Sequence, residues 1–123
     1  MSGQNFDLED RLLNYAAEII RLAERLPRTR AGNHISNQIL RSGTSALPNH
    51  GEAQAAESKN DFTHKMSICL KELRETKRWL RLIIRVYVNK LSAKTEPLLK
   101  ETEELIMIFS ASIKTAHKNI VGS

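Results

Sequence analysis

Five basic residues between positions 71 and 85 recur at helical spacing. They are Lys71, Arg74, Arg78, Arg81 and Arg85. At about 100° per residue they fall within about 80° of one another, on a ladder about 21 Å long. Aligned cations of this kind favour a polyanion, and no Phe or Tyr lies among them, so we expect sequence-nonspecific contacts with the phosphates of RNA or DNA. The alternative is a solvated face whose cations pair with carboxylates one turn away, such as Glu75.

The same segment carries an apolar stripe beside its core stripe. Its members are Ile68, Trp79, Leu82 and Val86. A helix on the surface of a monomeric bundle needs only one apolar stripe. A tryptophan with aliphatic neighbours is a typical anchor of a subunit interface. The stripe therefore predicts self-association, and the alternative is a core that is wide on this side.

Catalytic patterns are weak in this sequence. A ferritin-like di-iron site needs two Glu-x-x-His motifs, whereas the chain offers only Asp61-x-x-His64, with Glu57 one turn earlier. An aspartate near a helix start is typical of a cap. The lone Cys69 falls on a core face, where a thiol is inert. We expect no catalytic residues, no metal and no cofactor; a metal-dependent bundle enzyme remains the rival hypothesis.

A group of polar residues lies along the expected second helix. It consists of Arg41, Ser42, Ser45, Asn49 and Glu52. We interpret it as structural: Ser42 and Gly43 let a neighbouring helix approach, while Asn49 and Glu52 join hydrogen bonds that fix its register. Unpaired burial of such groups costs about 1–3 kcal/mol each, so partners are expected. His50 on this face is interpreted as a core histidine rather than a ligand.

Apolar residues spaced 3.6 apart predict four helices, at about 5–26, 33–57, 60–88 and 95–118. Pro27 ends the first helix. Pro48 interrupts the second, for which we predict a kinked continuation, with a break as the alternative. The short connections make neighbouring helices antiparallel. The sequence therefore predicts an all-α, up-down-up-down four-helix bundle that forms a single domain over residues 1–123.

Composition agrees with one helical domain. The chain has 123 residues, 41% hydrophobic, with 19 Lys+Arg against 14 Asp+Glu and a net charge of +5. This excess favours polyanions as partners. No window approaches the roughly 18 apolar residues of a membrane span, and the polar, acidic N-terminus is unlike a secretory signal. We expect a soluble, cytoplasmic protein without a membrane partner.

Several short runs together resemble one family. The runs are Leu26-Pro27, Leu40 to Ser45, Asn49, Glu52-Ala53, Ser58 with Asp61-Phe62, Lys71-Glu72-Leu73, Glu75-Thr76 and Trp79-Leu80. Their combined spacing resembles that of the bacterial four-helix-bundle family of 23S rRNA intervening-sequence proteins, also called S23-like proteins. Pro48 and His50 depart from the small or aliphatic residues usual there.

The resemblance implies a cytoplasmic four-helix bundle without known catalysis. Related proteins are the accessory variability determinants of diversity-generating retroelements, which form barrel-like homopentamers and bind nucleic acid and a reverse transcriptase. We therefore expect a homo-oligomer, a pentamer by this resemblance, that binds RNA or DNA weakly through the basic ladder. A reverse transcriptase partner is implied by the resemblance alone. The alternative is a structural module whose partner is another protein.

Overall fold

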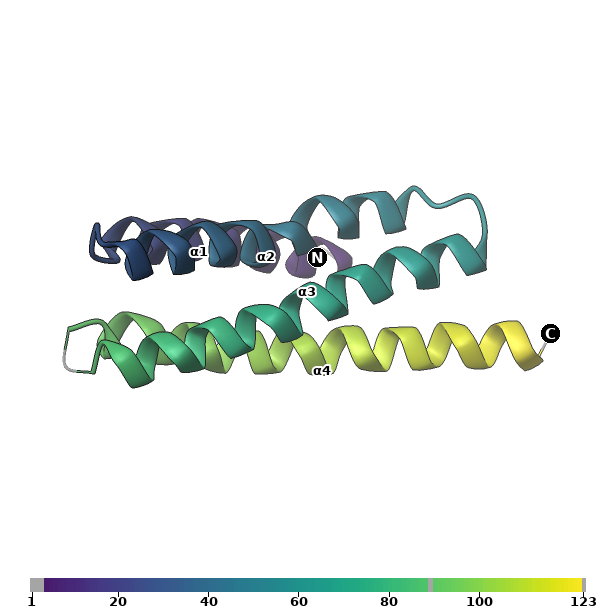
Figure 1. The fold of residues 1–123 in the computed structure, drawn as a ribbon. Helices are drawn as coiled ribbons and strands as arrows, with labels where there is room; N and C mark the ends of the chain where they lie inside the picture. The colour runs from purple at the N-terminus through teal and green to yellow at the C-terminus, as the bar shows by residue number, and fades with distance from the viewer. Residues whose placement is uncertain (1–3, 89, 123) are drawn as a thin grey trace.

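Four helices account for nearly all of the chain. The computed structural model describes residues 4–88 and 90–122. In these residues α1 (Gln4–Arg25), α2 (Arg30–Gln54), α3 (Lys59–Val86) and α4 (Ser92–Gly122) follow one another without a β-strand (Figure 1). Successive helices run antiparallel, which confirms the predicted all-α, up-down-up-down bundle. Within the same residues, no helix is both long enough and apolar enough to cross a membrane.

The helix ends follow their caps rather than the apolar stripes. The start of the second helix was predicted at residue 33, but α2 begins at Arg30, because the Thr29 hydroxyl accepts a hydrogen bond of 3.0 Å from the Gly32 amide. Gly32 lies inside this first turn, where an added Cβ would be 1.9 Å from the Pro27 carbonyl oxygen. Similarly, Ser58 caps α3. α2 ends at Gln54, three residues before the predicted end at 57, and α4 extends from Ser92 rather than from 95.

Pro48 does not break α2, so the interrupted alternative is wrong. Its ring nitrogen has no hydrogen to donate to the carbonyl four residues earlier. Side chains nearby bond other carbonyls of this stretch: Thr44 Oγ1 donates to Leu40 O at 2.6 Å, and Asn49 Nδ2 donates to Ser45 O at 2.9 Å. Buried residues lie on both sides of the proline. Packing against the neighbouring helices therefore keeps the helix continuous through it.

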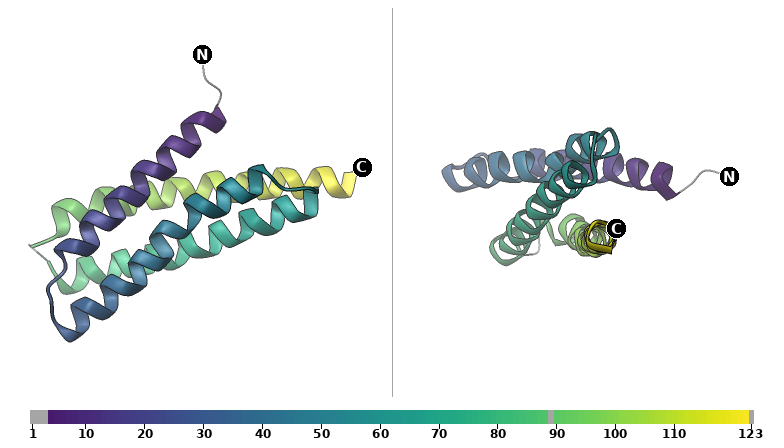
Figure 2. Two further views of the ribbon diagram at one scale, coloured as in Figure 1. Left: turned by 90° about the horizontal axis from the view of Figure 1, so that it is seen from above. Right: turned by 90° about the vertical axis from the view of Figure 1, so that its right-hand side faces the viewer.

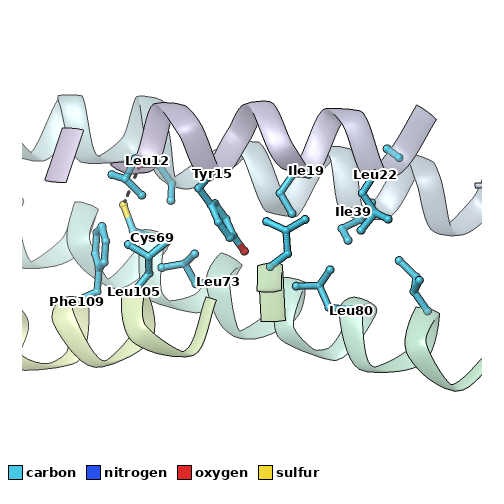
Figure 3. Close-up of a cluster of buried hydrophobic side chains, with 14 of the residues drawn as sticks. Leu12, Tyr15, Ile19, Leu22, Ile39, Cys69, Leu73, Leu80, Leu105 and Phe109 are labelled. Atoms are coloured by element: carbon cyan, nitrogen blue, oxygen red, sulfur yellow. Dashed lines mark hydrogen bonds between the residues drawn. The ribbon is translucent and has the colours of Figure 1, made fainter. Parts of the chain in front are cut away.

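The core runs along the centre of the bundle and uses all four helices (Figure 3). Ile19, Ile39, Leu73 and Leu105, one from each helix, are fully buried. At Gly43 of α2 an added Cβ would lie 2.7 Å from the Ile19 side chain, so the glycine permits the close approach of α1.

The helices pack in chain order, α1 on α2, α2 on α3 and α3 on α4, while α1 meets α4 over a shorter stretch. Figure 2 shows the reason: the N-terminal end of α1 diverges from the other three helices. α3 is inclined to α4, so the first part of α3 and the last part of α4 diverge (Figure 1). Residues of both segments line a groove at this end of the molecule.

Candidate nucleic-acid interface

The basic ladder of the sequence forms one exposed surface, which we call the basic face: Lys71, Arg74, Arg78, Arg81 and Arg85. All five side chains are exposed. Among the described residues, no carboxylate lies within 4.0 Å of any of their charged groups. The guanidinium of Arg78 donates to the Arg74 carbonyl oxygen at 3.2 Å, which holds it along the helix. The cationic groups are thus free to meet an external anion.

Glu75, the carboxylate that could have neutralised the basic face, is engaged by other residues. It forms an ion pair with Arg41 of α2 and accepts a hydrogen bond of 3.0 Å from the indole nitrogen of Trp79. Glu72 pairs with the same arginine at 3.0 Å. Both acidic residues of this segment are therefore engaged with α2 or with Trp79, away from the five cations.

The flank of α3 that faces α2 is consequently a region of matched charges, which we call the paired flank: Arg41, Glu52, Lys65, Glu72 and Glu75. Lys65 Nζ lies 2.7 Å from Glu52 Oε1. That hydrogen bond raises the pKa of Lys65. The three carboxylates and two cations form ion pairs with one another, and these pairs hold α2 against α3.

The remaining polar residues of α2 also have structural partners. The hydroxyls of Ser42 and Thr76 are buried and hydrogen-bond each other across α2 and α3 at 2.8 Å. Asn49 Nδ2 lies 3.0 Å from the Ser45 hydroxyl of its own helix. The Ser42–Thr76 bond joins α2 to α3 as predicted, whereas the bonds of Asn49 stay within α2, so its predicted role in the register of the two helices is wrong.

The apolar stripe is only partly on the surface. Leu82 and Val86 are 41% and 54% exposed, whereas Ile68 and Trp79 are half-buried. The Trp79 ring packs against the core and meets the His34 ring of α2 edge-on, with 5.9 Å between the ring centroids. Part of the Trp79 side chain is thus buried within its own protomer. Leu82 and Val86 provide most of the exposed surface of the stripe.

Catalytic chemistry finds little support in the site. Ser58, not Asp61, caps α3. Cys69 is fully buried, and burial raises the pKa of its thiol to about 12, which keeps it protonated and unreactive at neutral pH. Among the described residues, no three His, Cys, Asp or Glu side chains gather as metal ligands.

Basic residues of α4 extend the cationic surface and were not predicted from the sequence. A groove of about 920 Å³ lies between the start of α3 and the end of α4, and it adjoins the basic face at Arg74. Lys114, His117 and Lys118 of α4 line it. Their spacing of three and four residues was visible in the sequence, but their place in one groove with Arg74 depends on how α3 and α4 pack.

Fold and site together define a class: a small antiparallel four-helix bundle with a basic face on α3. A family model described as 23S rRNA-intervening sequence protein matches residues 4–111. A crystal structure of a protein of unknown function from the S23 ribosomal protein family of Bacteroides thetaiotaomicron VPI-5482 is similar to this chain, with a TM-score of 0.80 and 34% sequence identity. The match covers 91% of this chain and 99% of that one.

No curated protein matches the chain significantly. The family match covers most of the chain, including the polar residues of α2 and the whole of α3. The chain therefore belongs to the family of 23S rRNA-intervening sequence proteins. The resemblance found in the sequence is confirmed.

Proposed function

We propose that this protein is a non-enzymatic, cytoplasmic homo-oligomer, a pentamer, that binds RNA or DNA through the basic face of α3. One observation carries the proposal. Five exposed cations stand on one side of a single helix without a carboxylate partner among the described residues, while Glu72 and Glu75 of the same helix pair with Arg41 of α2.

The chemistry of the face suits phosphate more than base recognition. Guanidinium and ammonium groups attract phosphodiesters by charge, and releasing condensed counterions from the nucleic acid supplies the free energy. No Phe or Tyr lies among the five cations, so this face offers bases no stacking ring of that kind. We therefore expect weak binding that depends little on sequence and strongly on salt.

The salt dependence of binding tests this proposal. A fluorescently labelled, mixed-sequence RNA or DNA is titrated with the protein between 50 and 200 mM salt. If all five cations contact phosphates, the logarithm of the association constant falls against the logarithm of salt with a slope of about −3.5 for a single strand and about −4.5 for a duplex. Absence of binding at 50 mM salt, or binding that salt leaves unchanged, would contradict it.

Self-association is supported by Leu82 and Val86, which expose a large part of their apolar surface. We expect Leu82→Glu with Val86→Glu to shift the assembly to smaller species, measured by light scattering. Leu13→Glu is the matched control, because Leu13 is 53% exposed on α1, outside the stripe. Trp79→Ala should act in the same direction, with a cost of about 2 kcal/mol at a hot spot. An unchanged mass in the double variant would exclude the stripe as the interface.

The second candidate function is a structural module whose partner is another protein. It is favoured by exposed apolar residues away from the predicted interface, since Ile20 is 45% and Met107 is 70% exposed. The salt-dependent titration with a labelled oligonucleotide distinguishes the two functions. A protein-binding module has no reason to bind a mixed-sequence oligonucleotide with steep salt dependence.

A further inference from the structure

The groove between α3 and α4 adjoins the basic face at Arg74. Its walls come from the first four turns of α3 and the C-terminal part of α4, which diverge toward this end of the molecule (Figure 1). Arg74 belongs to both the groove and the basic face. The hollow is therefore a continuation of the proposed phosphate-binding surface onto a second helix.

The lining of the groove carries positive charge and no negative charge. Arg74, Lys114 and Lys118 line it, together with the imidazoles of His64 and His117. Neither aspartate nor glutamate lines it. None of the three basic residues is within 4.0 Å of a carboxylate among the described residues. An anion that enters meets cations from both helices at once.

The floor and walls of the groove differ from the basic face in chemistry. Leu70 and Ile113 contribute apolar surface, and Thr63, Ser67 and Ser110 contribute hydroxyls. The two imidazoles supply flat rings on which bases stack. The basic face has cations only. The groove thus combines charge for phosphates with apolar and planar surface for bases.

We infer that this groove binds a segment of single-stranded nucleic acid, with its phosphates on Arg74, Lys114 and Lys118 and its bases against His64, His117 and the apolar floor. The inference rests on the proposed function and specifies which form of nucleic acid the surface selects. A single strand offers unstacked bases together with its phosphates. A duplex keeps its bases inside the helix, so it can use the cations but not the floor.

The size of the groove sets the length of the segment. From Asn60 to Arg74 the α3 wall is about 21 Å long at about 1.5 Å per residue. A stacked strand rises about 3.4 Å per nucleotide along its axis, so this length accommodates at most about six nucleotides, and fewer where the strand is unstacked and extended. That is within the range of sites on known single-strand binding modules.

The other end of the same helix pair supplies the contrast. A hollow there lies between the end of α3 and the start of α4, and Glu96, Glu103 and Lys100 line it. Carboxylates and a lysine line this hollow together, so it lacks the uniformly positive lining of the groove at the other end. The same two helices thus carry one groove suited to nucleic acid and one that is not, which provides an internal control.

The main experiment reverses two charges at each end of α4. Lys114→Glu with Lys118→Glu alters the cationic groove. Lys94→Glu with Lys100→Glu changes the net charge equally on exposed lysines at the other end of the helix. Binding of a fluorescently labelled, mixed-sequence 12-nucleotide RNA is measured by anisotropy. We expect the groove variant to bind at least about tenfold more weakly than the control variant, with a salt slope shallower by about 1.4.

A second pair of variants tests base stacking without altering Lys or Arg. His64→Ala with His117→Ala should lower affinity for the single strand by about fivefold, because stacking surface is lost. Affinity for a duplex of the same sequence should stay unchanged. Circular dichroism checks that every variant keeps its helical content.

The outcomes separate the groove from the proposed function. If the two lysine variants weaken binding equally and reversal of Arg78 and Arg81 abolishes it, the groove is not the binding site. The proposal that the basic face binds nucleic acid would then still hold. Tighter binding of the duplex than of the single strand would also contradict the inference that the groove selects single strands. Absence of any binding by the unaltered protein at 50 mM salt would overturn both.

Discussion

The two flanks of α3 carry similar numbers of charges and use them differently. On the paired flank, Glu72 and Glu75 hold Arg41, and Lys65 holds Glu52. On the basic face, five cations point into solvent, and no described carboxylate reaches them. The paired flank lies where α2 crosses α3, so its charges join two helices. The basic face has no helix in front of it.

This contrast teaches that pairing, more than the number of charges, distinguishes a structural charge from one that is available to a ligand. The Glu72 side chain is only 14% exposed, so its ion pair is tied to helix packing. Fully exposed ion pairs contribute little to stability, and free surface cations contribute less. We therefore expect changes on the paired flank to alter folding, and changes on the basic face to alter binding.

The largest expected effect is on binding. Arg78→Glu with Arg81→Glu should weaken binding of a mixed-sequence oligonucleotide by about 100-fold at 50 mM salt, because two attractive contacts become repulsive. The free energy of unfolding should change by less than about 0.5 kcal/mol, as for other surface substitutions. Anisotropy titration and urea unfolding measure the two quantities.

The control for this variant is Arg25→Glu with Arg28→Glu, an equal change in charge at exposed residues outside α3. It should reduce affinity far less, through net charge alone. Equal weakening by the two double variants would show that the basic face has no special role.

The next effect is on folding. Glu75→Ala should lower the free energy of unfolding by about 1 kcal/mol, because Arg41 and the Trp79 indole lose their common partner. Glu103→Ala is the matched control; Glu103 pairs with Lys77 at 3.4 Å and is exposed, so its loss should cost less than about 0.5 kcal/mol. Urea unfolding compares the two. If Glu75→Ala and Glu103→Ala have equal free energies of unfolding, the ion pairs of the paired flank contribute no more to stability than an exposed ion pair does.

A buried histidine adds a pH dependence that belongs to neither flank. His50 is 1% exposed, and burial lowers its pKa, an effect that Glu9 partly opposes at 3.6 Å. The folded protein thus favours neutral His50. Stability should be highest above the ordinary histidine pKa of about 6.5 and should fall as the pH decreases through the lowered pKa. Urea midpoints between pH 7.5 and 5.5 measure this fall; an identical fall in His50→Gln would assign it to other groups.

The smallest effects come from a matched pair of single truncations. Arg41→Ala should lower the free energy of unfolding by about 0.5 kcal/mol, since its partners are partly exposed, and leave oligonucleotide affinity unchanged. Arg74→Ala should do the opposite, with unchanged stability and a fewfold loss of affinity. A reversed pattern would assign binding to the paired flank.

The bundle could be predicted from the sequence because stripes at the helical period specify both the helices and their buried sides. Exposure of the basic face was predictable for the same reason, since its residues lie away from the core stripe. The helix starts were less predictable. The start of α2 depends on the Thr29 hydroxyl and on the close approach of Gly32 to the Pro27 carbonyl. These contacts are local, but the spacing of apolar residues does not indicate them.

Features that depend on two helices could not be predicted from one stripe. Glu75 has a cation one turn away in sequence, yet its partner is Arg41, which the packing of α2 brings close. Likewise, Lys114 and Lys118 lie beside Arg74 only because α4 runs antiparallel to α3. Half-burial of Trp79 depends on His34 in the same way.

The most direct test follows the arginine side chains during binding. In a nitrogen–proton NMR spectrum, each guanidinium Nε–H gives its own signal, and a titration with a mixed-sequence RNA reports which of them meets phosphate. We predict shifts at Arg74, Arg78, Arg81 and Arg85, and constant positions for Arg41 and Arg11, which are held by carboxylates. Shifts confined to Arg41, or unchanged signals from the basic face at saturating RNA, would contradict the assignment of the binding surface to α3.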